Sequence, residues 1–311
     1  MDILASTTLA PIVLFVYNRP WHVQQTIEAL QKNELASESE LFIYSDAAKT
    51  EQDRLKVKEV RNYIHSIGGF KKITIIEREE NWGLAGSIID GVTAIVKQYG
   101  KIVVLEDDLV TSHYFLGFMN DALALYEGNP NVGMIHGHIY YIEGLPEVFF
   151  LQKSGCLGWG TWDSAWSEVS FDGSFLLKEI KRKGFKNDFD INDTYPFTKM
   201  LSEQVEGINS SWAIRVQASF FLKNRLTFYP SKSLVQHIGF DVGTHCGGAL
   251  RASDMDGKLF SERITAKLIE VNNCMEATKK LECFFKKQKK PLWKKIVQRV
   301  QRSLYAYKFG R

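Results

Sequence analysis

KIVVLEDDLV, at Lys101–Val110, decides the fold. Its first half, Lys101–Leu105, is a nearly continuous apolar run with β-branched residues, which predicts a buried parallel strand. Glu106, Asp107 and Asp108 follow at once, and three adjacent acids repel one another unless a cation shares their charge. Oxygen ligands of this kind suit Mg²⁺ or Mn²⁺. The competing interpretation is a solvated loop or a helix N-terminus, where acids are also favoured.

Upstream of this stretch, predicted strands and helices alternate. A second apolar run, APIVLFVY at Ala10–Tyr17, is typical of another buried strand. The alternation predicts an α/β fold with a mostly parallel central sheet. The other segments that we expect are strands at Leu41–Tyr44 and Lys72–Arg78 and helices at Pro20–Asn33, Gln52–Ser66 and Gly83–Tyr99.

Polar residues stand where the predicted strands end, and ligands of such sheets collect at the carboxyl ends of the strands. Asn18-Arg19, Asp46 and Glu106–Asp108 should therefore line one crevice. Asn81-Trp82-Gly83 precedes a helix and would approach a ligand through backbone amides, or form a simple turn. No GxGxxG or GxxxxGK[ST] loop occurs, which argues against a dinucleotide dehydrogenase or a P-loop NTPase.

Composition fits a soluble globular protein. Of 311 residues, 45% are hydrophobic and 24% charged, which excludes a disordered, collagen-like or coiled-coil chain. The longest apolar run, Leu9–Tyr17, is shorter than the roughly 18 residues of a membrane span and lacks a basic leader. The 4 cysteines form no CxxC pair, so we expect free thiols in a reducing, cytoplasmic compartment.

Basic residues concentrate at the C-terminal end. Residues 279–311 carry a formal charge of +11, and the rest of the chain −8. PLWKKIVQRVQRSLYAYKF, at Pro291–Phe309, has the pattern of an amphipathic helix with a basic face. We expect residues 251–311 to form a helical basic tail that binds an anionic membrane surface, placing the protein peripherally on the inner face of the cell membrane. The alternative is a helix that packs on the globule; specific nucleic-acid binding is not expected.

Four segments resemble glycosyltransferases of the GT-A fold, which is Rossmann-like and binds nucleotide-diphospho-sugars. These are PIVLFVYNRPWHVQQTIEAL, KIVVLEDDLVTSHYFLGFMNDAL, SGCLGWGTWDSAW and LTFYPSKSLVQHIGFDVGTHC. The segments are most similar to the N-acetylglucosaminyltransferase I type and to bacterial sugar transferases of surface-polysaccharide pathways. The resemblance implies a GT-A domain over residues 1–250, with a nucleotide-sugar half at 1–110 and an acceptor half at 111–250.

The resemblance also implies the donor chemistry: a UDP-sugar, with UDP-GlcNAc expected, and Mn²⁺ or Mg²⁺ as cofactor. Asp108 and His245 would bind the metal, and Asp107 the ribose. Glu106 would lie near the sugar or the waters bound to the metal, and Asp46 near the uracil or ribose. The residues that we expect at the nucleotide-sugar are Tyr17, Asn18, Arg19, Asp46, Asn81, Gly83, Glu106 and Asp107.

The acceptor half is less sharply defined. Trp159, Gly160 and His138 are the expected acceptor-binding residues, because aromatic faces stack on sugars; burial in the core is the alternative. An inverting enzyme needs a carboxylate to accept the acceptor's proton. In similar families an acid often follows the tryptophan that matches Trp212, but Ala213 stands there. The candidate bases are therefore Glu206, Glu203 and Asp163.

These expectations describe a metal-dependent, inverting glycosyltransferase acting on a glycan or lipid-linked acceptor in surface-polysaccharide synthesis. A retaining mechanism stays open because Ala213 removes the expected base. The alternatives are a nucleotidyltransferase on a similar sheet, although YNRPW is not its glycine-rich loop, and an inactive sugar- or membrane-binding scaffold.

Overall fold

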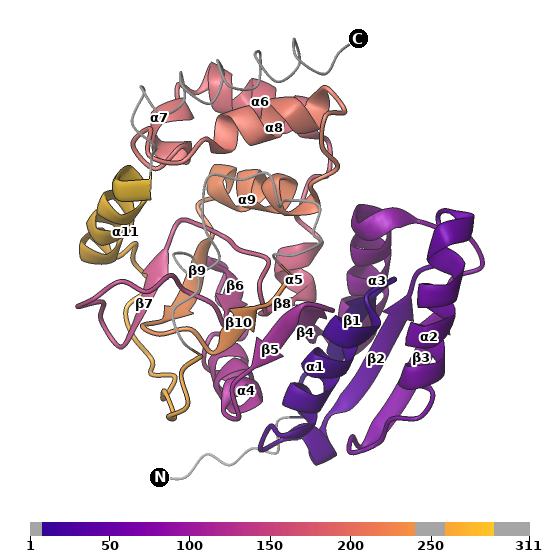
Figure 1. Cartoon of the computed structure of the whole chain (residues 1–311). Coiled ribbons are helices and arrows are strands. Elements are labelled where there is room, and N and C mark those ends of the chain that lie inside the picture. The colour runs from indigo at the N-terminus through magenta and orange to yellow at the C-terminus, as the bar shows by residue number, and fades with distance from the viewer. Residues whose placement is uncertain (1–7, 240–258, 289–311) are drawn as a thin grey trace, which may run out of the picture.

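The structure, a computed structural model, describes residues 8–239 and 259–288 (Figure 1). In that part of the chain, eight strands form one sheet in the order β3-β2-β1-β4-β8-β6-β9-β7, and β10 pairs with β5 in a small second sheet. The strands are β1 (Ile12–Val16), β2 (Glu40–Ser45), β3 (Lys72–Glu77), β4 (Lys101–Glu106), β5 (Leu109–Thr111), β6 (Val132–His136), β7 (Val148–Leu151), β8 (Trp159–Trp162), β9 (Leu226–Pro230) and β10 (Val235–His237).

The first half of the large sheet is parallel. β1 lies between β2 and β4, and β3 pairs with β2, all parallel. β8 then joins β4 antiparallel, and β6, β9 and β7 complete the sheet. Because β1 and β4 run side by side in the same direction, the residues that follow both strands meet at one edge.

Helices cover both faces of this sheet (Figure 1). Alternate residues of β1 explain this: Ile12 and Leu14 join one buried cluster with α1 and α4, whereas Val13 and Phe15 join another with α3 and α9. The helices are α1 (Pro20–Gln31), α2 (Arg54–Ile64), α3 (Gly83–Tyr99), α4 (Phe115–Leu125), α5 (Asp163–Trp166), α6 (Gly173–Arg182), α7 (Lys186–Phe189), α8 (Phe197–Val205), α9 (Trp212–Leu222) and α11 (Met275–Gln288).

Local sequence explains where these elements begin and end. Pro20 occupies the first turn of α1, where its missing N–H costs no hydrogen bond. α3 ends at Gly100, which has φ +79°, a conformation that favours glycine. The four expected strands and three expected helices of residues 10–110 are confirmed, with boundaries shifted by at most a few residues. The sequence pattern did not reveal β6, β7 or β8.

A third cluster joins α6, α8 and α9 to β7, β9 and α11. Leu281 and Phe285 of α11 are buried in it, and Tyr126 donates a hydrogen bond to the Lys267 carbonyl. The described residues after 258 therefore belong to the same globule, which differs from the separate tail expected over residues 251–311. The amphipathic stretch Pro291–Phe309 lies outside the described residues.

Within the described part of the chain, no helix combines the length and the apolar character needed to cross a membrane.

Candidate functional site

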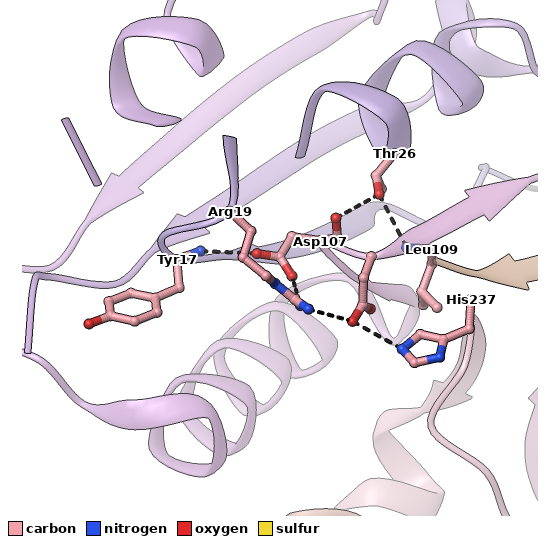
Figure 2. Close-up of polar contacts among 7 residues, drawn as sticks. Tyr17, Arg19, Thr26, Asp107, Leu109 and His237 are labelled. Atoms are coloured by element: carbon pink, nitrogen blue, oxygen red, sulfur yellow. Dashed lines mark hydrogen bonds and ion pairs between the residues drawn. The ribbon is translucent and has the colours of Figure 1, made fainter. Parts of the chain in front are cut away.

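The acidic turn after β4 contacts the loop after β1. The register that pairs Phe15 with Glu106 brings these two strand ends together. Arg19 donates a hydrogen bond from Nη2 to Oδ1 of Asp107, and the Tyr17 amide donates to Oδ2 of Asp107 over 3.4 Å (Figure 2). Asp107 is thus held by one guanidinium and one backbone amide.

Asp108 contacts two cationic or polar side chains. Nη1 of Arg19 lies 2.8 Å from Oδ2 of Asp108, and Nε2 of His237 lies 3.1 Å from the same oxygen. His237 comes from β10, which pairs antiparallel with β5 so that His237 stands opposite Leu109 (Figure 2). The Arg19 guanidinium therefore contacts both Asp107 and Asp108, and the His237 imidazole contacts Asp108.

Backbone hydrogen bonds fix the turn that carries these carboxylates. Thr26 of α1 donates from Oγ1 to the Asp107 carbonyl over 2.8 Å and accepts from the Leu109 amide over 3.2 Å. The Ile238 amide donates to the Asp108 carbonyl over 2.9 Å. The turn is tied to α1 on one side and to the segment after β10 on the other, which preorganises the two acids.

Gly239 contacts the acid cluster closely. A Cβ at this position would lie 2.2 Å from Oδ2 of Asp108 and 2.9 Å from Nη1 of Arg19. Both distances are too short for a carbon atom, so only glycine fits against this carboxylate without a shift.

Burial gives the three acids different proton affinities. Burial, with the charges of Asp108 and Asp107, raises the pKa of Glu106 to about 8. Burial also raises the pKa of Asp107, against the opposing effect of Arg19. Burial alone would raise the pKa of Asp108, but the hydrogen bond with His237 and the charge of Arg19 lower it. Asp108 is therefore the acid that stays ionised most readily.

Asp46 anchors the start of α3. Its two oxygens accept hydrogen bonds from the Trp82 amide at 2.9 Å, the Gly83 amide at 2.8 Å and the Asn81 side chain at 3.0 Å. Its own neighbour Ala47 donates a further bond over 2.9 Å. A carboxylate has about four acceptor positions, so Asp46 is fully engaged by the protein. The structure thus brings Asp46, Asn81 and Gly83 together, as one structural unit.

Tyr17 and Asn18 belong, with Arg19, to the loop that joins β1 to α1. The Lys49 amide donates to the Tyr17 hydroxyl over 2.9 Å, and Asn18 donates from Nδ2 to Oδ1 of Asp53 over 2.7 Å. Both residues are half-buried. The loop after β1 is thus held in place next to Arg19.

The expected acceptor residues lie in the interior. Trp159 is 0% exposed, with its ring centroid 5.6 Å from that of Trp166 and 5.3 Å from that of Trp212. Gly160 pairs with Val103 in the sheet, where a Cβ would meet the Ile102 carbonyl at 2.8 Å. Both positions differ from our expectation. The Trp159 ring is enclosed by other rings and offers no face to a sugar, and Gly160 is enclosed within the sheet.

The expected His138 is also buried. It lies beside His136, with the ring centroids 6.2 Å apart, and its carbonyl is 2.7 Å from Nδ1 of His136. The two histidines therefore form one buried pair at the end of β6.

The three candidate bases lie apart from the acidic turn. Asp163 follows Trp162, which pairs with Lys101, so Asp163 stands at the opposite end of β4 from Asp107. At about 3.3 Å per residue, that separation is on the order of 20 Å. Glu203 pairs with Lys199 at 3.5 Å on α8, a helix far from β4 and β5 (Figure 1). Glu206 directly follows α8 and accepts a hydrogen bond from Ser202.

The histidine at the acidic turn is His237, whereas from the sequence we expected His245 at the metal. His245 lies outside the described residues. The signal that points to His237 is the pairing of β10 with β5, which no local pattern of the sequence encodes.

The geometry also shows whether a divalent cation fits. Asp108 and His237 converge from two strands and present an ionised oxygen and an imidazole nitrogen. Among the described residues, no group of three or more His, Cys, Asp or Glu side chains is placed to hold a metal ion alone. Such a pair suits a metal that takes its other ligands from substrate phosphates and water, as Mg²⁺ does. The residues therefore fit a substrate-dependent metal.

Comparison with known proteins identifies the class. Residues 12–143 match the model of Glycosyl transferase family 2, a range that includes Arg19, Asp46, Asp107 and Asp108. Together with the mostly parallel α/β sheet, this match makes residues 12–143 a glycosyltransferase domain of the GT-A type. No curated protein sequence matches the chain.

Two solved structures show a weaker likeness to this chain. TarS 1-349 of S. aureus has 15% identity and a TM-score of 0.40 over 73% of this chain and 59% of TarS 1-349. The mannosyltransferase PcManGT of Pyrobaculum calidifontis, solved with GDP-Man and Mn²⁺, has 12% identity and a TM-score of 0.38 over 68% of this chain and 73% of its own. The comparison with TarS thus spans less than two thirds of that structure.

Proposed function

We propose that the protein is a metal-dependent glycosyltransferase that moves a sugar from a UDP-sugar to a hydroxyl group of a glycan or lipid-linked acceptor. The observation that carries the proposal is the convergence of Arg19, Asp107, Asp108 and His237 at the carboxyl ends of β1 and β4. In parallel α/β sheets this edge is where nucleotide ligands bind.

Each residue of this cluster has a role that its contacts support. Asp108 and His237 would hold Mn²⁺ or Mg²⁺, which when bound stabilises the negative charge of the departing diphosphate. Arg19 lies against both carboxylates and would place its positive charge beside that diphosphate. Asp107, held by the Tyr17 amide, would receive the ribose hydroxyls.

Asp46 enters the proposal as a positioning residue. Its hydrogen bonds hold Asn81-Trp82-Gly83 at the start of α3, one strand away from the Tyr17 loop. Trp82 is 48% exposed there, with the Arg78 guanidinium 3.9 Å from its ring centroid. We place the nucleoside between Trp82, at the start of α3, and the loop after β1.

Calorimetry with UDP tests the proposal. UDP should bind the wild-type protein tightly only when Mn²⁺ is present, and Asp108→Ala should abolish the metal-dependent part. Asp163→Ala is the matched control, because Asp163 lies beside the start of β4, at the opposite end of that strand from Asp108. UDP binding that is unchanged both without Mn²⁺ and in Asp108→Ala would refute the metal site. Absence of UDP binding would refute the UDP-sugar donor, and dTDP and GDP would then be titrated.

Product analysis then separates the alternatives. An active transferase should release UDP slowly from UDP-GlcNAc, with water as acceptor, in a reaction that needs the metal. A scaffold would bind UDP without releasing it from the sugar. A nucleotidyltransferase would instead release pyrophosphate from UTP in the presence of a sugar phosphate.

A further inference from the structure

Lys153 occupies an unusual position in the segment that joins β7 to β8. Its side chain is half-buried, and Nζ lies 5.8 Å from the ring centroids of both Tyr140 and Tyr229. Nζ donates a hydrogen bond to the Ser154 carbonyl over 3.3 Å. The ammonium group thus points between aromatic rings and one backbone oxygen.

No carboxylate balances this charge in the described part of the chain. The ionisable neighbours that face Lys153 are Cys156 and His136. Burial raises the pKa of Cys156 to about 12, and burial lowers the pKa of His136 well below its usual range, so both are neutral near pH 7. Burial lowers the pKa of Lys153 to about 8, so the ammonium form still predominates at neutral pH.

The last residues of this segment lie at the same edge of the sheet as the acidic turn. β8 runs antiparallel to β4 with Trp159 opposite Val104, so the residues just before Trp159 extend past the carboxyl end of β4. The charges of Glu106, Asp108 and Lys153 all act on Cys156, so Cys156 lies near each of the three. Cys156 thus links Lys153 to the β8 side of the acidic turn.

An unpaired, partly desolvated ammonium destabilises a folded protein unless a ligand balances it. We propose that Lys153 binds a negatively charged group of the acceptor, either a phosphate or a carboxylate. The proposal rests on the proposed transferase function, because it places the acceptor beside the donor's reacting end. Tyr140 and Tyr229 shield the ammonium from water, which strengthens its attraction for an anion.

The test measures binding of three sugar probes to the full-length protein saturated with UDP and Mn²⁺. Glucose 6-phosphate and glucuronate carry the two candidate anions, and glucose carries none. We expect at least one anionic probe to bind, and Lys153→Met to weaken it about tenfold or more, the size of a lost hydrogen bond to a charged group. Lys153→Arg should restore much of the affinity. The probe that binds identifies the anion.

A matched control and a stability measurement complete the design. Lys183 also lies 5.8 Å from an aromatic ring, that of Phe185, but is exposed, so Lys183→Met should leave probe binding unchanged. Lys153→Met should keep or raise the melting temperature, because it removes an unbalanced charge. A lowered melting temperature with unchanged probe binding would show a structural lysine and overturn the proposal.

Two further outcomes would also overturn it. The anionic probes are therefore also titrated without UDP and Mn²⁺; if a probe binds only in their absence, Lys153 serves the donor diphosphate and not the acceptor. If UDP and Mn²⁺ bind but neither anionic probe does, the acceptor anion is refuted while the donor function stands. Failure of UDP binding itself is a separate result that concerns the proposed function.

Discussion

Nε2 of His237 lies 3.1 Å from Oδ2 of Asp108, although 129 residues separate the two along the chain. The contact exists because β10 returns to pair with β5, directly after the acidic turn. A segment from the C-terminal half of the chain therefore completes a cluster that the N-terminal half began. The proposed donor site therefore depends on the pairing of β10 with β5 as well as on the acids.

Removal of the imidazole should weaken metal-dependent nucleotide binding. We expect His237→Ala to reduce the apparent affinity for Mn²⁺ by about 100-fold in UDP titrations, since the loss of a group that binds or orients a metal costs at least about tenfold. The measurement is calorimetry at a series of Mn²⁺ concentrations. His65→Ala is the control, because His65 forms a similar 2.8 Å contact with Glu77 at the exposed surface. Equal Mn²⁺ dependence in His237→Ala and wild type would remove His237 from the metal site.

A methyl group at position 239 should disturb the acid cluster directly. In Gly239→Ala the Cβ would stand 2.2 Å from Oδ2 of Asp108, so the carboxylate or the backbone must move. We expect UDP binding with Mn²⁺ to weaken by at least about tenfold, with a stability cost of about 1–3 kcal/mol. Gly68→Ala is the matched control, since a Cβ there meets nothing within 4 Å. Wild-type UDP affinity in Gly239→Ala would show that the Asp108 carboxylate has no part in donor binding.

The sequence predicted the parallel half of the sheet well because that half is built from local patterns. Ile12–Val16 and Lys101–Glu106 are nearly continuous apolar runs; a segment with helical periodicity follows the first run, and another precedes the second. The strand ends then had to meet, so Arg19, Asp107 and Asp108 could be placed together before the structure was known. Their detailed contacts confirm that juxtaposition.

The β6–β9 half was harder because its pairing is non-local. Val132–His136 pairs with β8 and β9, segments from different parts of the chain, and no repeated pattern announces this. We expected Trp159 to stack on a sugar, yet Trp166 of α5 and Trp212 of α9 pack against its ring and bury it. Whether an aromatic residue is buried in the core or available to stack on a sugar depends on such tertiary neighbours.

Loss of the Asp46 carboxylate should destabilise the fold. In Asp46→Asn one oxygen becomes an NH₂ group, which faces backbone N–H donors from Trp82 or Gly83 that then lack an acceptor. We expect the free energy of unfolding to fall by about 2 kcal/mol, within the usual cost of an unsatisfied buried donor. Urea denaturation measures this change. Asp188→Asn, at an exposed position of α7, should stay within about 0.5 kcal/mol of wild type; a similarly small effect of Asp46→Asn would contradict the anchoring role.

The raised pKa of Glu106 predicts a pH-dependent difference between the wild type and Glu106→Gln. Glu106 has a pKa of about 8 in the folded protein, against 4.5 as its ordinary value, so between these values the folded state binds more protons than the unfolded state. The stability of the wild type should therefore fall as pH rises through this window, and glutamine, which does not titrate, should remove that loss. Urea denaturation of the metal-free proteins from pH 5 to pH 9 measures the difference.

The free energy of unfolding of Glu106→Gln, relative to that of the wild type, should be lowest at pH 5. It should rise with a slope of at most about 1.4 kcal/mol per pH unit and level off above pH 8. Both proteins share every other titrating group, so the difference reports Glu106 together with its coupling to Asp107 and Asp108. Glu77→Gln serves as the control, since Glu77 is paired with Arg61 and His65 near the surface and lies on β3, away from the acidic turn. A stability difference between Glu106→Gln and wild type that stays constant from pH 5 to pH 9 would mean that Glu106 titrates outside this range, and that the burial and neighbouring charges at the turn do not hold its proton.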